Sequence, residues 1–149
     1  MAVALAAIAF CVATAAPAVF QVLLAFGAPW GALTLGGLHP GQLPSAFRVN
    51  AAFSAVVLSG TALVVCVRAG LILPGRQDTV RKSVWVVVAF CVLEVALHVI
   101  TPSYWERILW LPCVSVMLVA SSYVAMRAEN GGFAARGERA GSHNYVPMH

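Results

Sequence analysis

Four long apolar stretches, separated by turns of more polar residues, dominate the pattern of the chain. Each approaches the ~20 apolar residues that a helix needs to cross the hydrocarbon core of a bilayer. We expect the four spans at about residues 2–26, 49–67, 84–100 and 108–126. Because an unpaired backbone amide is costly in lipid, each stretch should be helical. The pattern predicts an all-α fold, a four-transmembrane-helix bundle running up-down-up-down in a membrane domain over residues 1–126.

Composition supports this class and excludes several others. Of the 149 residues, 61% are hydrophobic and 9% are charged, whereas soluble domains are about half apolar and a quarter charged. A soluble enzyme, a disordered chain and a coiled coil are therefore excluded. The four cysteines lie singly within apolar stretches and form no CxxC pair. They indicate neither a zinc ribbon nor a dithiol redox motif, and we expect no cofactor and no metal.

The first apolar stretch has one alternative interpretation, a secretory signal peptide. Small residues around Ala13–Ala16 resemble a cleavage site. The stretch lacks a positively charged start, however, and it is longer than the apolar region of a typical signal peptide. We therefore favour a membrane span.

The segment between the first two spans, Gly27 to Arg48, is the longest loop. It holds five glycines and three prolines, yet it is nearly uncharged and rich in large apolar side chains. A solvated linker would be more polar, so we expect a compact cap on the outer end of the bundle. In the short turn after the third span, Ser103 and Glu106 have the spacing of a capping box, in which Glu106 reaches back to the Ser103 amide. The residues expected in this outer-loop cap are Trp30, His39, Arg48, Glu106 and Arg107.

The basic residues predict the orientation in the membrane. Four spans place both termini on one side, which carries seven of the nine Lys and Arg residues, while the other side carries only Arg48 and Arg107. The positive-inside rule therefore predicts a multi-pass protein of the cell (inner, cytoplasmic) membrane with both termini cytoplasmic. Residues 127–149 are polar and poor in apolar side chains, which predicts a disordered cytoplasmic tail. The basic residues form no run with interleaved aromatics, so nucleic acid is not an expected partner.

Three residues with chemical potential share one face of the third span. Glu94 is the only acid deep in a span, and His98 and Cys91 lie about one helical turn after and before it. An ionisable group at this depth costs at least ~2.5–3.5 kcal/mol, and such groups face a partner or a cavity. Cys91, Glu94 and His98 should therefore point into the bundle.

Three interpretations of this polar face remain open. The favoured one is a structural hydrogen-bonded pair, joined also to Gln21 of the first span or Asn50 of the second. The second is a proton relay or ligand pocket built on Glu94 and His98. The third is a metal site that includes Cys91, but its spacing matches no known motif and it is one ligand short.

The second span also carries a row of small residues, Ala51, Ala55 and Ser59. Such a row lets another helix approach closely, either within the bundle or from a second copy of the chain. The sequence contains no phosphate-binding loop, no Ser-His-Asp order and no HExxH motif. It therefore offers no recognisable catalytic signature.

Two sequence signatures resemble those of a known group of proteins. They are Gln21-Val-Leu-Leu-Ala-Phe-Gly-Ala-Pro-Trp-Gly31 with Gly36-Gly37, Leu43-Pro44 and Arg48, and Thr101-Pro-Ser-Tyr-Trp-Glu-Arg107 with Trp110-Leu-Pro112. Over about residues 17–126 the chain resembles a group of small, uncharacterised, four-helix bacterial integral membrane proteins. The resemblance implies a fold and a location rather than an activity. An asparagine stands in that group where this chain has His98, which implies that His98 is not an essential catalytic base.

These observations lead to two function hypotheses. The first is a small binding protein or an accessory subunit of a membrane complex, with the lipid bilayer and either another membrane protein or a second copy as partners. The alternative is a membrane-embedded enzyme or proton-coupled carrier that uses Glu94 and His98. The two differ in whether Glu94 faces a ligand-sized cavity or a packed interface with a satisfied hydrogen bond.

Overall fold

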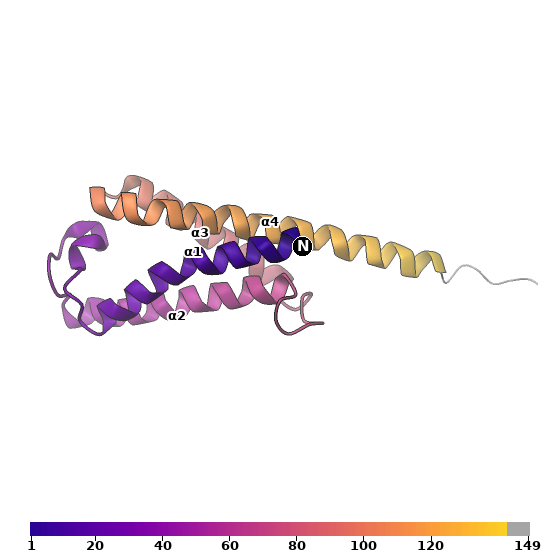
Figure 1. Ribbon diagram of the computed structural model, residues 1–149, viewed down its shortest axis with the longest axis horizontal. Helices are drawn as coiled ribbons and strands as arrows, with labels where there is room; N and C mark the ends of the chain where they lie inside the picture. The colour runs from indigo at the N-terminus through magenta and orange to yellow at the C-terminus, as the bar shows by residue number, and fades with distance from the viewer. Residues whose placement is uncertain (143–149) are drawn as a thin grey trace, which may run out of the picture.

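The computed structural model describes the backbone of residues 1–142 and the side chains of residues 1–127. Its long helices are α1 (Ala2–Ala25), α2 (Ser45–Arg68), α3 (Arg81–Ile100) and α4 (Tyr104–Ser142). They run alternately up and down along one axis (Figure 1). The described part of the chain contains no β-strand. The predicted all-α, up-down-up-down bundle is confirmed.

Each of these helices is long and apolar enough to cross a membrane, with residues Tyr104–Arg127 providing the fourth span. Large apolar side chains cover the outside of the bundle, among them Val56 at 70% exposure and Val119 at 71%. A water-soluble monomer rarely exposes contiguous apolar surface on this scale. The fold therefore defines a multi-pass membrane protein whose outer surface faces lipid.

Two helices begin about four residues earlier than the expected spans. α2 begins at Ser45 rather than near residue 49, and α4 begins at Tyr104 rather than near residue 108. An arginine lies in the first turn of each helix and donates to a backbone carbonyl at the end of the preceding helix or in the adjoining turn. Arg48 Nε donates to the Ala25 carbonyl at 3.0 Å, and Arg107 Nη2 donates to the Thr101 carbonyl at 2.6 Å. These charges are therefore accommodated inside the helices and do not mark where they begin.

The other end of α4 also differs from the sequence prediction. Composition predicts disorder from residue 127, whereas α4 continues to Ser142. Extending an existing helix avoids the cost of nucleating a new one, which is the unfavourable step in helix formation. Residues 143–149, which complete the predicted tail, lie outside the described residues.

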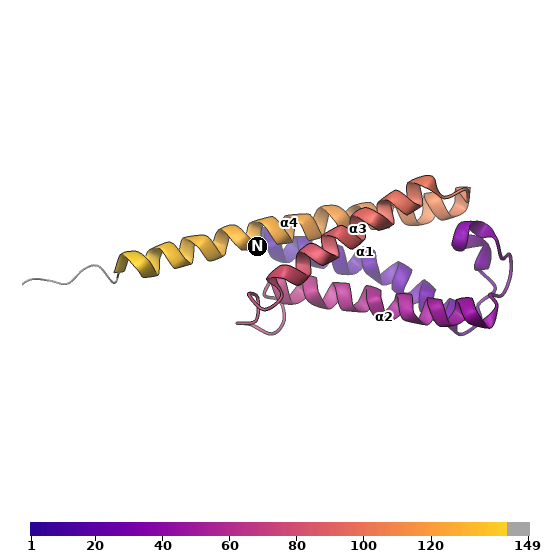
Figure 2. The same cartoon turned by 180° about the vertical axis from the view of Figure 1, so that it is seen from behind.

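The four helices do not contact one another evenly. α1 packs against both α2 and α4, and α3 packs mainly against α4, while α2 and α3 share few contacts. Figure 2 shows α2 and α3 close together near the loop that joins them and separating toward the opposite end of the bundle. We call the end with the α2–α3 loop the tail end, and the end with residues 26–44 the cap end.

The main hydrophobic core lies in the tail-end half. It includes Phe10 of α1, Val65 of α2, Val84 of α3 and Val124 of α4, each fully buried. Many of its members are small or β-branched, which lets the helices approach closely. On α2, Ala51 and Ala55 are buried inside the bundle while Ser59 is exposed. The two alanines of the small-residue row therefore serve internal packing.

Residues 26–44 form the cap loop, which folds back onto the bundle as the sequence predicts. Two short 3-10 turns, η1 (Gly31–Leu33) and η2 (Leu35–Gly37), give it shape. The Gly31 amide donates to the Gly41 carbonyl at 2.9 Å and closes the loop. A side chain on Gly31 would collide with the His39 carbonyl, so this close approach requires glycine. Leu43, near the end of the loop, is buried against the bundle at 4% exposure.

Candidate functional site

A cavity of about 640 Å³ lies between α2 and α3 at the cap end. Its volume is within the range of small-molecule sites, ~300–1,000 Å³. Phe53 of α2 and Leu97 and Ile100 of α3 line it and are 66%, 47% and 74% exposed. Because these exposed apolar residues belong to the two separating helices, the cavity opens sideways, toward the surface that faces lipid.

Four of the five residues predicted for the intramembrane polar site line this one cavity. Gln21 contributes from α1, Asn50 from α2, and Glu94 and His98 from α3. They are far apart in the sequence and come together because the helices are antiparallel. Bulky aromatic residues from all four helices, among them Phe20 and Phe90, complete the wall.

The fifth residue, Cys91, does not face the cavity. It is fully buried in the main core with Val84 and Val87 of the same helix. A spacing of three residues along a helix leaves about 60° between side chains. On α3 that angle is enough to direct Glu94 to the cavity and Cys91 into the packed core, so these residues do not form a common ligand set.

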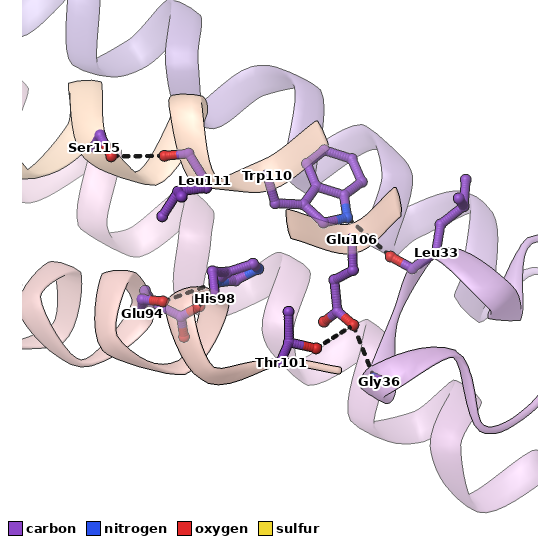
Figure 3. Close-up of polar contacts among 9 residues, drawn as sticks. All are labelled: Leu33, Gly36, Glu94, His98, Thr101, Glu106, Trp110, Leu111 and Ser115. Atoms are coloured by element: carbon purple, nitrogen blue, oxygen red, sulfur yellow. Dashed lines mark hydrogen bonds and ion pairs between the residues drawn. The ribbon is translucent and has the colours of Figure 1, made fainter. Parts of the chain in front are cut away.

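Glu94 and His98 lie on neighbouring turns of α3 (Figure 3). His98 Nδ1 is 2.8 Å from the backbone carbonyl oxygen of Glu94 and 3.7 Å from its carboxylate Oε2. A carbonyl oxygen only accepts, so this network assigns the proton to Nδ1. In the neutral imidazole, Nε2 is then left as a hydrogen-bond acceptor. The Glu94 side chain is 28% exposed, so its carboxylate is accessible from the cavity.

The polar side chains that line this cavity form few hydrogen bonds with the rest of the chain. Among the described residues, the Glu94 carboxylate and the amides of Gln21 and Asn50 form no hydrogen bond with another residue. The predicted hydrogen bonds from the Glu94–His98 pair to Gln21 or Asn50 are therefore not formed. Asn50 is exposed and Glu94 and Gln21 are partly exposed, so these groups are open to a ligand or to water.

The roof of the cavity is fixed by Glu106 at the start of α4. Its Oε2 accepts hydrogen bonds from the Gly36 amide at 2.8 Å and from the Thr101 hydroxyl at 3.0 Å (Figure 3). Only half of the predicted capping box is present, since the Glu106 amide donates to Ser103 Oγ at 3.3 Å. The carboxylate does not reach back to the Ser103 amide because it binds the cap loop instead. Glu106 thus joins the cap loop to the α3–α4 turn.

Trp110, which also lines the cavity, is the second anchor of the cap loop. Its Nε1 donates to the Leu33 carbonyl at 2.9 Å, and its ring lies 4.7 Å from that of Phe20. A tryptophan near a helix end is expected at the membrane boundary, but Trp110 is only 8% exposed. Sequence reasoning missed this role, because the Leu33 partner is 77 residues away.

The other predicted cap residues lie at the cap end without lining the cavity. Trp30 stacks on Phe20 with ring centroids 6.2 Å apart, and His39 packs on Phe47 at 4.8 Å. Arg48 and Arg107 bind backbone carbonyls, as described above. Trp30 and His39 thus pack the cap loop, Arg48 and Arg107 bind the neighbouring helix end and turn, and Glu106 both holds the loop and faces the cavity.

The described residues contain no group of three His, Cys, Asp or Glu side chains placed to bind a metal ion. The cavity instead offers a carboxylate, an imidazole acceptor and two amides beside apolar walls. Such an arrangement suits the recognition of a molecule with one polar end, and it also permits proton exchange between Glu94 and a bound molecule.

The chain matches no protein-family profile, no curated protein and no solved structure in comparisons with known proteins. The resemblance to small four-helix bacterial membrane proteins therefore stays a prediction. The fold itself gives the class, a multi-pass membrane protein with four apolar helices.

Proposed function

We propose that this protein is a non-enzymatic binding protein that takes a small amphipathic molecule from the bilayer into the cavity between α2 and α3. One observation carries the proposal: a cavity of about 640 Å³ combines a lateral opening with side-chain polar groups of Gln21, Asn50 and Glu94 that form no hydrogen bond within the described chain. A packed structural interface would leave neither the volume nor the free hydrogen-bonding groups.

The lining of the cavity suits a molecule with two different ends. The rim is apolar, with Phe53, Val57 and Leu97 on the facing sides of α2 and α3. The inner wall carries Glu94 and His98. An apolar chain would leave lipid through the rim and remain in apolar surroundings, while its polar end would reach groups that lipid cannot satisfy.

The location follows from charge. We propose a bacterial cytoplasmic membrane with both termini in the cytoplasm, supported by seven basic residues on the terminal side against two on the other. The cavity then lies in the outer half of the bilayer, beneath the cap loop. A role as the ligand-binding accessory subunit of a larger membrane complex is compatible with this placement.

Native mass spectrometry of the full-length protein, released from nanodiscs made with native membrane lipids, tests the proposal. Ser54→Trp places a large side chain in the cavity wall, and Val56→Trp places the same side chain on the lipid-facing surface of α2. We expect a bound small molecule on the parent protein and on Val56→Trp, and its loss from Ser54→Trp at an unchanged Tm. Equal bound masses on all three proteins would contradict the proposal.

One observation favours a second candidate, a proton-coupled carrier or membrane enzyme that uses Glu94 and His98. The Glu94 carboxylate is accessible from the cavity and lies beside an imidazole. In liposomes containing a pH-sensitive dye, a carrier would move protons when a gradient of the bound molecule is imposed, and Glu94→Gln would abolish this flux. A binding protein would give no flux in either form.

A further inference from the structure

We infer that the molecule bound in this cavity is a primary alkylammonium, with its charged end at Glu94 and His98 and its chain between α2 and α3. This inference rests on the proposed binding function and names the chemical class of the ligand. It is carried by the charge of the lining, by the places of the nearest arginines and by the hydrogen-bonding capacity of the free groups.

The lining of the cavity has one sign of fixed charge. Its titratable residues in the described chain are two carboxylates, Glu94 and Glu106, and one imidazole, His98, with no Lys and no Arg. Glu106 Oε2 accepts hydrogen bonds from the Gly36 amide and the Thr101 hydroxyl, which share its charge with the cap loop and the α3–α4 turn. The Glu94 carboxylate accepts no hydrogen bond within the described residues and has the His98 imidazole 3.7 Å away, and at membrane depth a carboxylate requires a proton or a cation beside it.

The arginines at the cap end do not supply this cation. Arg48 donates to the Ala25 carbonyl and Arg107 donates to the Thr101 carbonyl, and neither lines the cavity. Within the described residues, His98 is the nearest basic group, and its Nδ1 is directed to the backbone carbonyl of its own helix. A cationic ligand would therefore be the strong positive partner of Glu94.

The free polar groups of the cavity are mostly hydrogen-bond acceptors. They therefore favour a cation that can donate hydrogen bonds. The Glu94 carboxylate and the His98 Nε2 can only accept hydrogen bonds, and the amides of Gln21 and Asn50 add two oxygen acceptors beside their N–H donors. A primary ammonium has three donors and no acceptor, so it matches this set. A quaternary ammonium has no donor and would leave these acceptors unpaired, and a carboxylate would be repelled by Glu94.

The apolar walls fit the rest of such a molecule. Phe20, Phe53 and Phe90 line the cavity from three different helices. Their ring faces attract a nearby cation and also pack against an alkyl chain. The lateral opening leaves the end of a long chain free to lie among the lipid tails.

The probe for this proposal is tritiated dodecylamine, measured by scintillation proximity on the full-length protein in phosphatidylcholine nanodiscs. Unlabelled dodecylamine, dodecanol, dodecanoate and dodecyltrimethylammonium compete with it, at concentrations expressed per lipid because all four enter the bilayer. We expect the primary amine to compete at least about tenfold better than the other three. Equal competition by the alcohol or the quaternary ammonium would overturn the inference while leaving an amphiphile-binding cavity in place.

Glu94→Gln keeps the shape of the side chain and removes its charge. We expect this variant to bind dodecylamine at least about tenfold more weakly than the parent, and to bind dodecanol within about twofold of it. Asp78→Asn is the matched control, because it removes one carboxylate from the exposed α2–α3 loop outside the cavity. Unchanged amine binding by Glu94→Gln, at an unchanged Tm, would overturn the inference.

Two further arms separate the possible results. Nanodiscs that contain phosphatidylethanolamine test whether a lipid headgroup supplies the ammonium: weaker apparent dodecylamine binding indicates the lipid, and unchanged binding indicates a free amine. Either result supports the inference only if Glu94→Gln also weakens the binding of dodecylamine. If Ser54→Trp binds all four dodecyl compounds as the parent does, the proposed cavity function itself fails.

Discussion

The two ends of the bundle use the same four helices but are built differently. At the tail end, Phe10, Val65 and Val124 are fully buried, and all four helices contribute to one core. At the cap end, α2 and α3 separate around a cavity, and the end is closed by a loop that hydrogen bonds hold in place. The difference lies in the side chains, since both ends lie within the same apolar spans.

This difference indicates a division of roles along the membrane normal. In lipid, helices associate through close packing and interhelical hydrogen bonds more than through water exclusion. The small and β-branched residues of the tail end satisfy the packing requirement. The polar residues of the cap end leave hydrogen-bonding groups unpaired around an open volume. Stability is therefore concentrated at the tail end, and the proposed ligand binding would take place at the cap end.

The largest expected effect compares one phenylalanine from each region. Phe10→Ala removes a fully buried ring from the tail-end core and should lower the free energy of unfolding by about 3 kcal/mol or more. Phe53→Ala removes a ring that is 66% exposed at the cavity rim and should cost less than about 1 kcal/mol. Reversible unfolding in mixed detergent and dodecyl sulfate micelles measures both. Equal losses would remove the distinction between the two ends.

The next effect concerns the bond that holds the cap loop. Glu106→Ala removes the acceptor of the Gly36 amide and the Thr101 hydroxyl and should cost about 2 kcal/mol. Hydrogen exchange at the Gly36 amide should accelerate strongly in this variant. Glu106→Gln keeps a carbonyl acceptor and should retain much of the protection. Unchanged Gly36 exchange in Glu106→Ala would show that the loop is held by other contacts.

A smaller effect is expected from the small residues of α2. Ala55 is 8% exposed inside the bundle, so Ala55→Leu should force helices apart and cost about 1–2 kcal/mol. Ser59→Leu, at an exposed position one turn further on, should be neutral within about 0.5 kcal/mol. The two variants are compared by the same unfolding measurement. A larger loss for Ser59→Leu would indicate that the exposed face packs against a second copy of the chain.

The smallest effect comes from a single hydrogen bond at the cap end. Trp110→Phe keeps an aromatic ring beside Phe20 but loses the bond to the Leu33 carbonyl, which should cost about 1 kcal/mol. Trp105→Phe is the matched control, because Trp105 is 66% exposed. The free energies of unfolding should differ by about that amount. An equal or larger loss in the control would contradict a role of Trp110 as an anchor.

The fold was largely predictable because apolar runs of about 20 residues, three of them bounded by basic residues, indicate membrane spans directly. The errors occur where a charged residue lies inside a helix. Arg48 reads as a boundary in the sequence, but its guanidinium binds the Ala25 carbonyl, and α2 begins three residues before it. The cap was predictable as well, since a loop rich in glycine, proline and large apolar residues is expected to bury its apolar side chains against the end of the bundle.

The site was only partly predictable. Periodicity along one helix places Glu94 and His98 on one face, and their isolation in apolar sequence marks them as important. The local rule fails for Cys91, because the neighbouring helix α4 decides which part of that face is packed. It fails also for Glu106, where a capping box competes with a hydrogen bond to Gly36, 70 residues away. Contacts over such separations depend on how the helices are arranged, which local spacing does not encode.

Photoaffinity labelling of the full-length protein in nanodiscs tests most directly whether the cavity between α2 and α3 is a binding site. The probe is a dodecylamine with a diazirine in its chain, and the labelled residues are mapped by peptide mass spectrometry. We predict labelling at Ser54, Val57 and Leu97, suppressed by excess dodecylamine and absent in Ser54→Trp. Uniform labelling of lipid-facing positions such as Val56 and Val119, insensitive to excess dodecylamine, would contradict the account.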